Sequence, residues 1–123
     1  KIISIGLAYR DRHPNSQHTH LIRQAKEYIE HHYADTELSL NALAARANLS
    51  ASHFSAVFSQ ETHQTFKEYL TEIRMNKAKE LLRMTALRSA EIAYQVGYND
   101  PHYFSSVFKK NTGLSPIEFR SQA

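Results

Sequence analysis

Apolar residues recur at helical spacing along almost the whole chain after residue 19. They return every three or four positions, which places them on one face of an α-helix. Strict alternation of apolar and polar residues, the signal of a half-buried strand, is hard to find. The pattern therefore predicts an all-α fold of about seven helices. They are expected at residues 20–33, 40–47, 51–62, 65–84, 90–96 and 101–112, with a last helix that opens at 115–118.

Residues that cap helices stand at several of these boundaries. Ser39, Ser50 and Asp100 each precede a helical pattern, and their side-chain oxygens can accept a hydrogen bond from a backbone N–H of the first turn. The segments 65–68 and 115–118 both have the spacing of a capping box, in which a Ser or Thr hydroxyl and a Glu carboxylate each accept from a backbone N–H. These local signals predict where the helices begin.

One structural unit occurs twice in the chain. Residues 43–49 recur as 92–98 with a displacement of 49 residues, and residues 54–69 recur as 104–119 with a displacement of 50. Apolar positions match apolar positions in both comparisons, so the second copy has one extra residue in its turn. Each copy consists of a short helix, a tight turn and a second helix, which is the geometry of a helix-turn-helix.

The repeat predicts the domain organisation. Two helix-turn-helix subdomains, 20–64 and 85–123, are expected on either side of a long linker helix at 65–84. Residues 1–19 lack a helical pattern and are expected to be a linker or the tail of a preceding N-terminal domain. The chain begins with Lys rather than Met, which fits a fragment of a longer protein.

The second helix of each copy begins with short polar residues. A recognition helix reads base edges in the major groove of DNA with its N-terminal turns, where such side chains can form hydrogen bonds. His53 and His102 align at a displacement of 49 residues near these starts and are candidates for DNA contact. The other polar candidates are Ser52, Ser55, Ser105 and Ser106.

Composition permits nucleic-acid binding without requiring it. The formal net charge is +3, and the pI is about 9.2. The absence of Cys excludes disulfides and thiolate metal sites and fits a reducing compartment. No apolar run approaches the roughly 20 residues that a membrane span needs. No nucleophile with a base and no Gly-rich phosphate loop is present, so neither an enzyme nor a cofactor is expected.

Two features of the sequence have alternative interpretations. The chain has eight His, and His18 with His20, or His31 with His32, could ligate zinc, but solvated surface His is the interpretation we prefer. Phe residues spaced four apart in each copy could stack on the bases of single strands. Such spacing is more typical of a helix core.

Residues 92–120 carry a long motif that resembles the AraC/XylS family of transcription regulators. The motif consists of Ile92-Ala93, Gly97-Tyr98-Asn99-Asp100, Tyr103-Phe104, Phe108-Lys109-Lys110, Gly113, Ser115-Pro116 and Phe119-Arg120. Residues 69–82 resemble the joining helix of that family, and the similarity extends over about residues 20–121.

The resemblance implies a seven-helix DNA-binding domain of a bacterial, cytoplasmic regulator. It implies activation or repression of transcription through an asymmetric promoter site, with RNA polymerase as a further partner and a sensing or dimerisation domain on the N-terminal side. The recognition helices would be residues 51–62 and 101–112. A linker helix of ~19 residues spans ~28 Å, and successive major-groove faces lie ~34 Å apart. The two recognition helices are therefore expected in adjacent major grooves.

The position of each residue in the family pattern implies a role. On the first recognition helix the base-edge candidates are Ser52, His53, Ser55 and Ala56, and on the second they are Pro101, His102, Ser105 and Ser106. The phosphate candidates are Arg74, Lys77, Lys109 and Lys110.

The chain departs from the family pattern at several positions. Many relatives have Arg, the commonest partner of guanine, where this chain has Ala56 and Ser106. His63 stands in place of the Gly at the end of the second copy, so the left-handed residue there is costlier. Arg88-Ser89 replace the capping pattern of Ser39-Leu40, which predicts a shifted or frayed start for that helix.

Two rival functions remain open at the level of sequence. One is a helical bundle with a duplicated hairpin that binds no nucleic acid. The other is a helical interaction module that recruits a protein such as polymerase without touching DNA.

Overall fold

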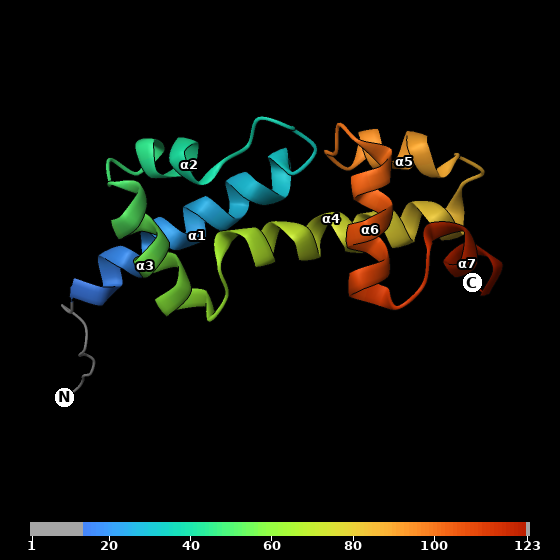
Figure 1. Cartoon of the computed structure of the whole chain (residues 1–123). Coiled ribbons are helices and arrows are strands. Elements are labelled where there is room, and N and C mark those ends of the chain that lie inside the picture. The colour runs from blue at the N-terminus through green and yellow to red at the C-terminus, as the bar shows by residue number, and fades with distance from the viewer. Residues whose placement is uncertain (1–13, 123) are drawn as a thin grey trace. The chain divides into compact units, whose positions relative to one another are not determined.

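The structure, a computed structural model, describes residues 14–122, and this part of the chain folds as seven α-helices without a strand (Figure 1). This arrangement confirms the all-α class that the apolar spacing predicts. The helices are α1 (Pro14–His32), α2 (Leu40–Arg46), α3 (Ala51–Thr62), α4 (Phe66–Met84), α5 (Ser89–Gln95), α6 (Pro101–Thr112) and α7 (Pro116–Gln122).

The chain divides into two compact units. Among the described residues, unit 1 comprises residues 14–31 and 39–67, and unit 2 comprises residues 32–38 and 68–122. Each unit holds one copy of the repeat: α2 packs on α3 in unit 1, and α5 packs on α6 in unit 2. The segment 32–38 connects two helices of unit 1 but belongs to unit 2, and unit 2 also includes most of α4.

The first helix begins earlier than the apolar pattern predicts. It starts at Pro14 rather than at His20, so residues 14–19 of the expected linker are helical. Proline suits the first position of a helix, and the exposed Gln17 and Thr19 add no apolar stripe that sequence could reveal. His32, the last residue of the helix, is exposed. The rest of the expected linker, residues 1–13, lies outside the described residues.

Each unit has a core built around two Phe residues one helical turn apart. Phe54 and Phe58 in unit 1, and Phe104 and Phe108 in unit 2, are all 0% exposed. The prediction that they form the core is thereby confirmed, and their rings have no free face for bases. Val107, which lies between Phe104 and Phe108 on α6, is only half-buried and packs against this core. The remaining core residues are Ile22, Ala25, Ile29, Leu43, Ala44 and Val57 in unit 1, and Leu70, Met75, Ala78, Leu82, Ile92, Ala93, Val96 and Tyr98 in unit 2.

Most helix starts carry the predicted caps. The hydroxyls of Ser39 and Ser50 accept hydrogen bonds from the backbone N–H groups of Ala42 and His53, both at 3.1 Å. The Asp100 carboxylate accepts from the N–H of His102 at 2.9 Å. At α7 the capping box is complete, since Ser115 N–H donates to Glu118 at 2.8 Å and Glu118 N–H donates to the Ser115 hydroxyl at 3.1 Å. The hydrogen bond from the Ser115 N–H, followed by the contact with the Ser115 side chain, lowers the pKa of the Glu118 carboxyl.

The expected disturbance at the start of α5 is wrong. The helix begins at Ser89, which matches Leu40 at the start of α2. Arg88 offers no hydroxyl to cap the helix, but its own N–H donates to the Glu91 carboxylate at 2.7 Å. Glu91 also places a negative charge at the N-terminal end of the helix dipole. This half of a capping box fixes the start.

The second helices of the two copies, α3 and α6, end with the same hydrogen-bonding pattern. The hydroxyl of Thr62 lies 2.8 Å from the carbonyl oxygen of Phe58, and that of Thr112 lies 2.9 Å from the carbonyl oxygen of Phe108. The next residue adopts the left-handed conformation, with φ of 63° at His63 and 83° at Gly113. A side chain in that conformation costs about 1–2 kcal/mol, which glycine avoids.

Replacing His63 with Gly is therefore expected to stabilise unit 1. We expect His63→Gly to raise the free energy of unfolding by about 0.5–1 kcal/mol, because glycine relieves the left-handed strain but gains entropy when unfolded. Hydrogen exchange of amides in α3 measures the change, because it reports on unit 1 alone. His20→Gly, at an exposed position inside α1, is the control and should destabilise by about 1 kcal/mol. Loss of stability in His63→Gly would contradict the strain argument.

Candidate nucleic-acid interface

The helix caps fix how the two copies correspond. Ser50 and Asp100 are equivalent N-caps, and each is followed by a helix of 12 residues. The displacement is therefore 50 residues from the first residue of α3 onward, and the extra residue of the second copy lies in the turn before Asp100. Consequently His102 matches Ser52, and Tyr103 matches His53. The pairing of His53 with His102 by a displacement of 49 is wrong.

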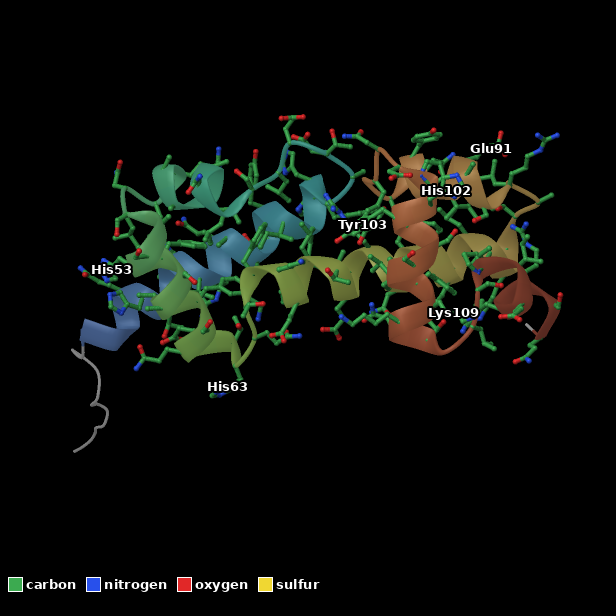
Figure 2. All side chains as sticks on the ribbon, viewed as in Figure 1. His53, His63, Glu91, His102, Tyr103 and Lys109 are labelled. Carbon is green, nitrogen blue, oxygen red and sulfur yellow. The ribbon has the colours of Figure 1, made fainter. Side chains whose placement is uncertain are left out.

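The exposed face of α3 is polar and carries no Lys or Arg. Ser52, His53 and Ala56 are exposed, and Ser55 is half-buried. The ring of His53 meets the ring of His18 from α1 edge to face, with 5.9 Å between centroids. Figure 2 shows His53 on the outer side of α3 and His63 beyond the end of that helix. The first-copy candidates thus share one surface of the first turns.

The corresponding face of α6 is also polar but ends in positive charge. His102 and Ser106 are exposed, while Pro101 and Ser105 are half-buried. Lys109 and Lys110 are exposed in the last turn and form no ion pair with another residue between 14 and 122. In Figure 2, His102 lies at the N-terminal end of α6 and Lys109 lies toward its C-terminal end.

Tyr103 belongs to this surface, although sequence reasoning missed it as a candidate. Its side chain is 49% exposed in the first turn of α6. The ring packs against Tyr98, with 5.9 Å between centroids and an interplanar angle of 55°. Tyr98 in turn packs on the buried ring of Phe104 at 5.6 Å. Aligning the copies by their N-caps would have placed Tyr103 opposite His53 and revealed it.

Lys77 lies on α4 and is already paired. Its ammonium group lies 3.0 Å from the Glu80 carboxylate, three residues further along the helix. This contact raises the pKa of Lys77, so the ammonium group is charged at neutral pH. The pair is exposed, so a phosphate could displace the carboxylate at little cost.

Arg74 is buried, which is at odds with the phosphate contact expected from the resemblance. Only 8% of the residue is exposed. Its Nε donates to the carbonyl oxygen of Tyr33 at 2.8 Å, and its Nη2 donates to the carbonyl oxygen of Asp35 at 3.1 Å. The guanidinium carbon also lies 5.1 Å from the centre of the Tyr98 ring. Burial lowers the pKa of Arg74, and Tyr98 opposes that shift. We therefore assign Arg74 a structural role.

Gly97 lies directly against these contacts. It has a φ of +107°, and a Cβ built on it would lie 2.6 Å from the Tyr33 carbonyl oxygen and 2.8 Å from Nε of Arg74. Glycine is thus required twice, for the backbone conformation and for the close approach of the segment after α1. The matching residue of the first copy, Asn48, has φ of 58°.

The described residues form neither a metal site nor a membrane-spanning helix. Within residues 14–122, no three side chains among His, Cys, Asp and Glu come together to hold a metal ion. Among the helices described, none has the length and apolar character needed to cross a membrane. The His pairs that could ligate zinc, His18 with His20 and His31 with His32, thus have no third ligand among the described residues.

Two packed helix-turn-helix motifs with polar, exposed second helices define the class of this protein: it is a double helix-turn-helix protein. A family model described as a helix-turn-helix domain matches residues 43–122. The arabinose operon regulatory protein of Escherichia coli K12 is 38% identical over 100 residues, which cover 81% of this chain and 34% of that protein. The transcriptional activator Btr of Bacillus subtilis is 44% identical over 86 residues, which cover 70% of this chain and 16% of Btr.

Solved structures have the same fold. The C-terminal domain of AraT, a response regulator of Geobacillus stearothermophilus, has a TM-score of 0.82 and 42% identity, covering 84% of this chain and 85% of that one. The DNA-binding domain of the transcriptional factor AdpA, solved with a target DNA, has a TM-score of 0.77 at 24% identity, covering 82% of this chain and 90% of that one. The chain belongs to the AraC/XylS family and corresponds to its C-terminal DNA-binding domain.

Proposed function

We propose that this chain binds a specific sequence of double-stranded DNA as the DNA-binding part of a transcription regulator, with α3 and α6 as the recognition helices. The observation that carries the proposal is the repeated architecture: two capped helices of equal length, each with its first turns exposed and polar. Membership of the AraC/XylS family supports it. An enzyme is not what this arrangement favours, since polar first turns suit recognition of base edges.

We further propose that α3 and α6 enter adjacent major grooves. The length of α4 supports this, because 19 residues span ~28 Å, close to the ~34 Å between successive major-groove faces. A binding selection on random duplexes tests it. Two half-elements about one helical turn apart are expected, and a single short element would contradict the proposal.

The base-edge set is the one expected from sequence, with Tyr103 added. It comprises Ser52, His53, Ser55 and Ala56 on α3, and Pro101, His102, Tyr103, Ser105 and Ser106 on α6. The phosphate set comprises Lys77, Lys109 and Lys110, and Arg74 is removed because it is buried. Since α3 has no cation, salt-dependent affinity should come mainly from unit 2.

Neutralising either lysine of α6 is expected to reduce the salt dependence of DNA binding. In Lys110→Gln the slope of log affinity against log salt should fall by about one unit, because one fewer counterion is released. Fluorescence anisotropy with a labelled duplex measures the slope between low and moderate salt. Gln is the residue at the matching position of the first copy, Gln60, so the helix should tolerate it. Gln60→Ala is the control, and a slope equal to that of the parent in Lys110→Gln would remove Lys110 from the phosphate set.

Removing the His102 side chain is expected to weaken specific binding more than non-specific binding. His102→Ala should lose about tenfold in affinity for a selected site and little for random duplex, since one base contact is worth about 1–3 kcal/mol. Competition titrations with both duplexes measure the ratio. The exposed His20→Ala on α1 is the control for loss of an imidazole. Equal losses on both duplexes would count against base readout at His102.

The remaining partners follow from the relatives. This chain spans about a third of the arabinose regulator and a sixth of Btr. We propose that the full protein also has a sensing or dimerisation domain and acts in the cytoplasm, where bacterial promoters lie. RNA polymerase is the proposed further partner, because Btr is described as an activator. A chain that binds polymerase but no duplex at low salt would instead favour the protein-recruiting alternative.

A further inference from the structure

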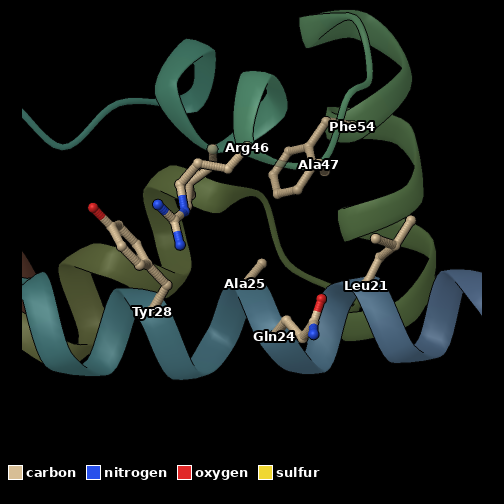
Figure 3. Close-up of a pocket in the computed structure, with 8 residues that line it drawn as sticks. Leu21, Gln24, Ala25, Tyr28, Arg46, Ala47 and Phe54 are labelled. Carbon is tan, nitrogen blue, oxygen red and sulfur yellow. The ribbon is translucent and has the colours of Figure 1, made fainter.

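Unit 1 contains a hollow between its first three helices. Its volume is about 230 Å³. Figure 3 shows the lining side chains converging from α1, from α2 and the residue after it, and from the start of α3. Drug-sized ligands usually occupy about 300–1,000 Å³, so this hollow suits a smaller molecule with a single ring. The lining residues are Leu21, Gln24, Ala25, Tyr28, Leu43, Arg46, Ala47 and Phe54.

The lining of the hollow carries charge of only one sign. Arg46 is the only charged residue in it, and no carboxylate lines the hollow. A second hollow of unit 1, about 410 Å³ in volume, differs because two cations and three carboxylates line it. The charges of the second hollow can compensate each other, whereas the single cation of the first leaves a net attraction for an anion.

The guanidinium group of Arg46 is held by a contact with an aromatic ring, but its hydrogen-bond donors are unused among the described residues. It lies over the ring of Tyr28, with 4.0 Å between the guanidinium carbon and the ring centroid. Within residues 14–122, no hydrogen bond or ion pair joins Arg46 to another residue. The stacked face leaves the N–H groups in the guanidinium plane available, which is the geometry that accepts a carboxylate in a bidentate pair. The Gln24 amide is a second polar group in the lining.

The second copy of the repeat differs from the first at two residues that line this hollow. Val96 stands where the first copy has Ala47, and it is 0% exposed. Both residues follow the short helix with nearly the same backbone, φ −91° at Ala47 and φ −97° at Val96. Gln95 replaces Arg46 in the second copy. Two substitutions therefore distinguish the copies at this position, one of size and one of charge.

We propose that this hollow of unit 1 is a binding site for a small aromatic carboxylate. The carboxylate pairs with Arg46, and the ring lies against the apolar lining, where the rings of Tyr28 and Phe54 offer aromatic contacts. The proposal is independent of DNA binding, since no residue of the base-edge or phosphate sets lines the hollow.

Benzoate titrated into the 123-residue chain tests the proposal, with amide chemical shifts as the readout. Saturable shifts are expected around Ala25 and Ala47 with a dissociation constant on the order of 1 mM, typical of a ligand this small. Benzyl alcohol lacks the charge and hexanoate lacks the ring, so both should bind at least tenfold more weakly. Absence of saturable shifts with benzoate up to about 20 mM, or equal binding of either analogue, would overturn the assignment.

Variants that introduce the matching residues of the second copy test where the ligand binds. Ala47→Val should weaken benzoate at least tenfold by narrowing the hollow, and Arg46→Gln should do the same while benzyl alcohol is unaffected. Ala45→Val, an equal change at an exposed position of α2, is the matched control and should bind benzoate like the parent. Circular dichroism spectra like that of the parent establish that each variant is folded. Unchanged benzoate binding in folded Ala47→Val would place the ligand elsewhere and refute the site.

Discussion

Gly97→Ala is expected to lower the stability of unit 2 by about 3–4 kcal/mol. Alanine at a φ of +107° is strained by about 1–2 kcal/mol. Its Cβ would also lie 2.6 Å from the Tyr33 carbonyl oxygen, a backbone atom that cannot move without disturbing the hydrogen bond from Arg74. Loss of a buried hydrogen bond adds about 1–3 kcal/mol. Few single substitutions in an exposed turn would cost as much.

Gly113→Ala provides the matched control for this prediction. Gly113 also has positive φ, +83°, but a Cβ built there would meet nothing within 4 Å. It should therefore cost only the backbone strain, about 1 kcal/mol. Hydrogen exchange of amides in α5 and α6 is the appropriate measurement, because it reports on unit 2 alone whereas circular dichroism sums both units. Equal losses in the two variants would show that the approach of Tyr33 contributes nothing.

Arg74→Met is expected to destabilise unit 2 by about 3 kcal/mol. Methionine keeps much of the length of the side chain, so the substitution removes mainly the hydrogen bonds to the carbonyl oxygens of Tyr33 and Asp35. The partly buried Tyr33 carbonyl would then lack that donor, at a cost of about 1–3 kcal/mol. The contact of the guanidinium with the ring of Tyr98 would also be lost.

The same variant separates the structural role of Arg74 from a phosphate contact. At a temperature where Arg74→Met is folded, the salt slope of its DNA affinity should equal that of the parent, because the parent Arg74 is only 8% exposed. Arg74→Lys should restore little of the stability, since a lysine ammonium does not reproduce the planar fork that reaches both carbonyls. A slope reduced by about one unit with unchanged hydrogen exchange would instead return Arg74 to the phosphate set.

Local signals explain why much of the fold was predictable. Helical periodicity and capping residues act within a few positions of each other, so Ser50, Asp100 and the box at 115–118 marked their helices correctly. The helix starts that were predicted wrongly also have local causes. Residues 14–19 have no apolar stripe, and at Arg88 the cap comes from Glu91 further along the chain. The register of the two copies could also have been read from the N-caps, which would have identified Tyr103.

The sequence by itself determined the helices, the duplicated motif and the polar turns that lead to the proposed DNA surface. Only the tertiary structure decided that Arg74 is internal, because the carbonyl that its Nε contacts lies 41 residues away along the chain. It also decided why Gly97 must be glycine and that Ala47 lines a hollow. Periodicity reports which face of a helix is apolar, whereas burial of a charge or the volume left between helices depends on partners distant in sequence.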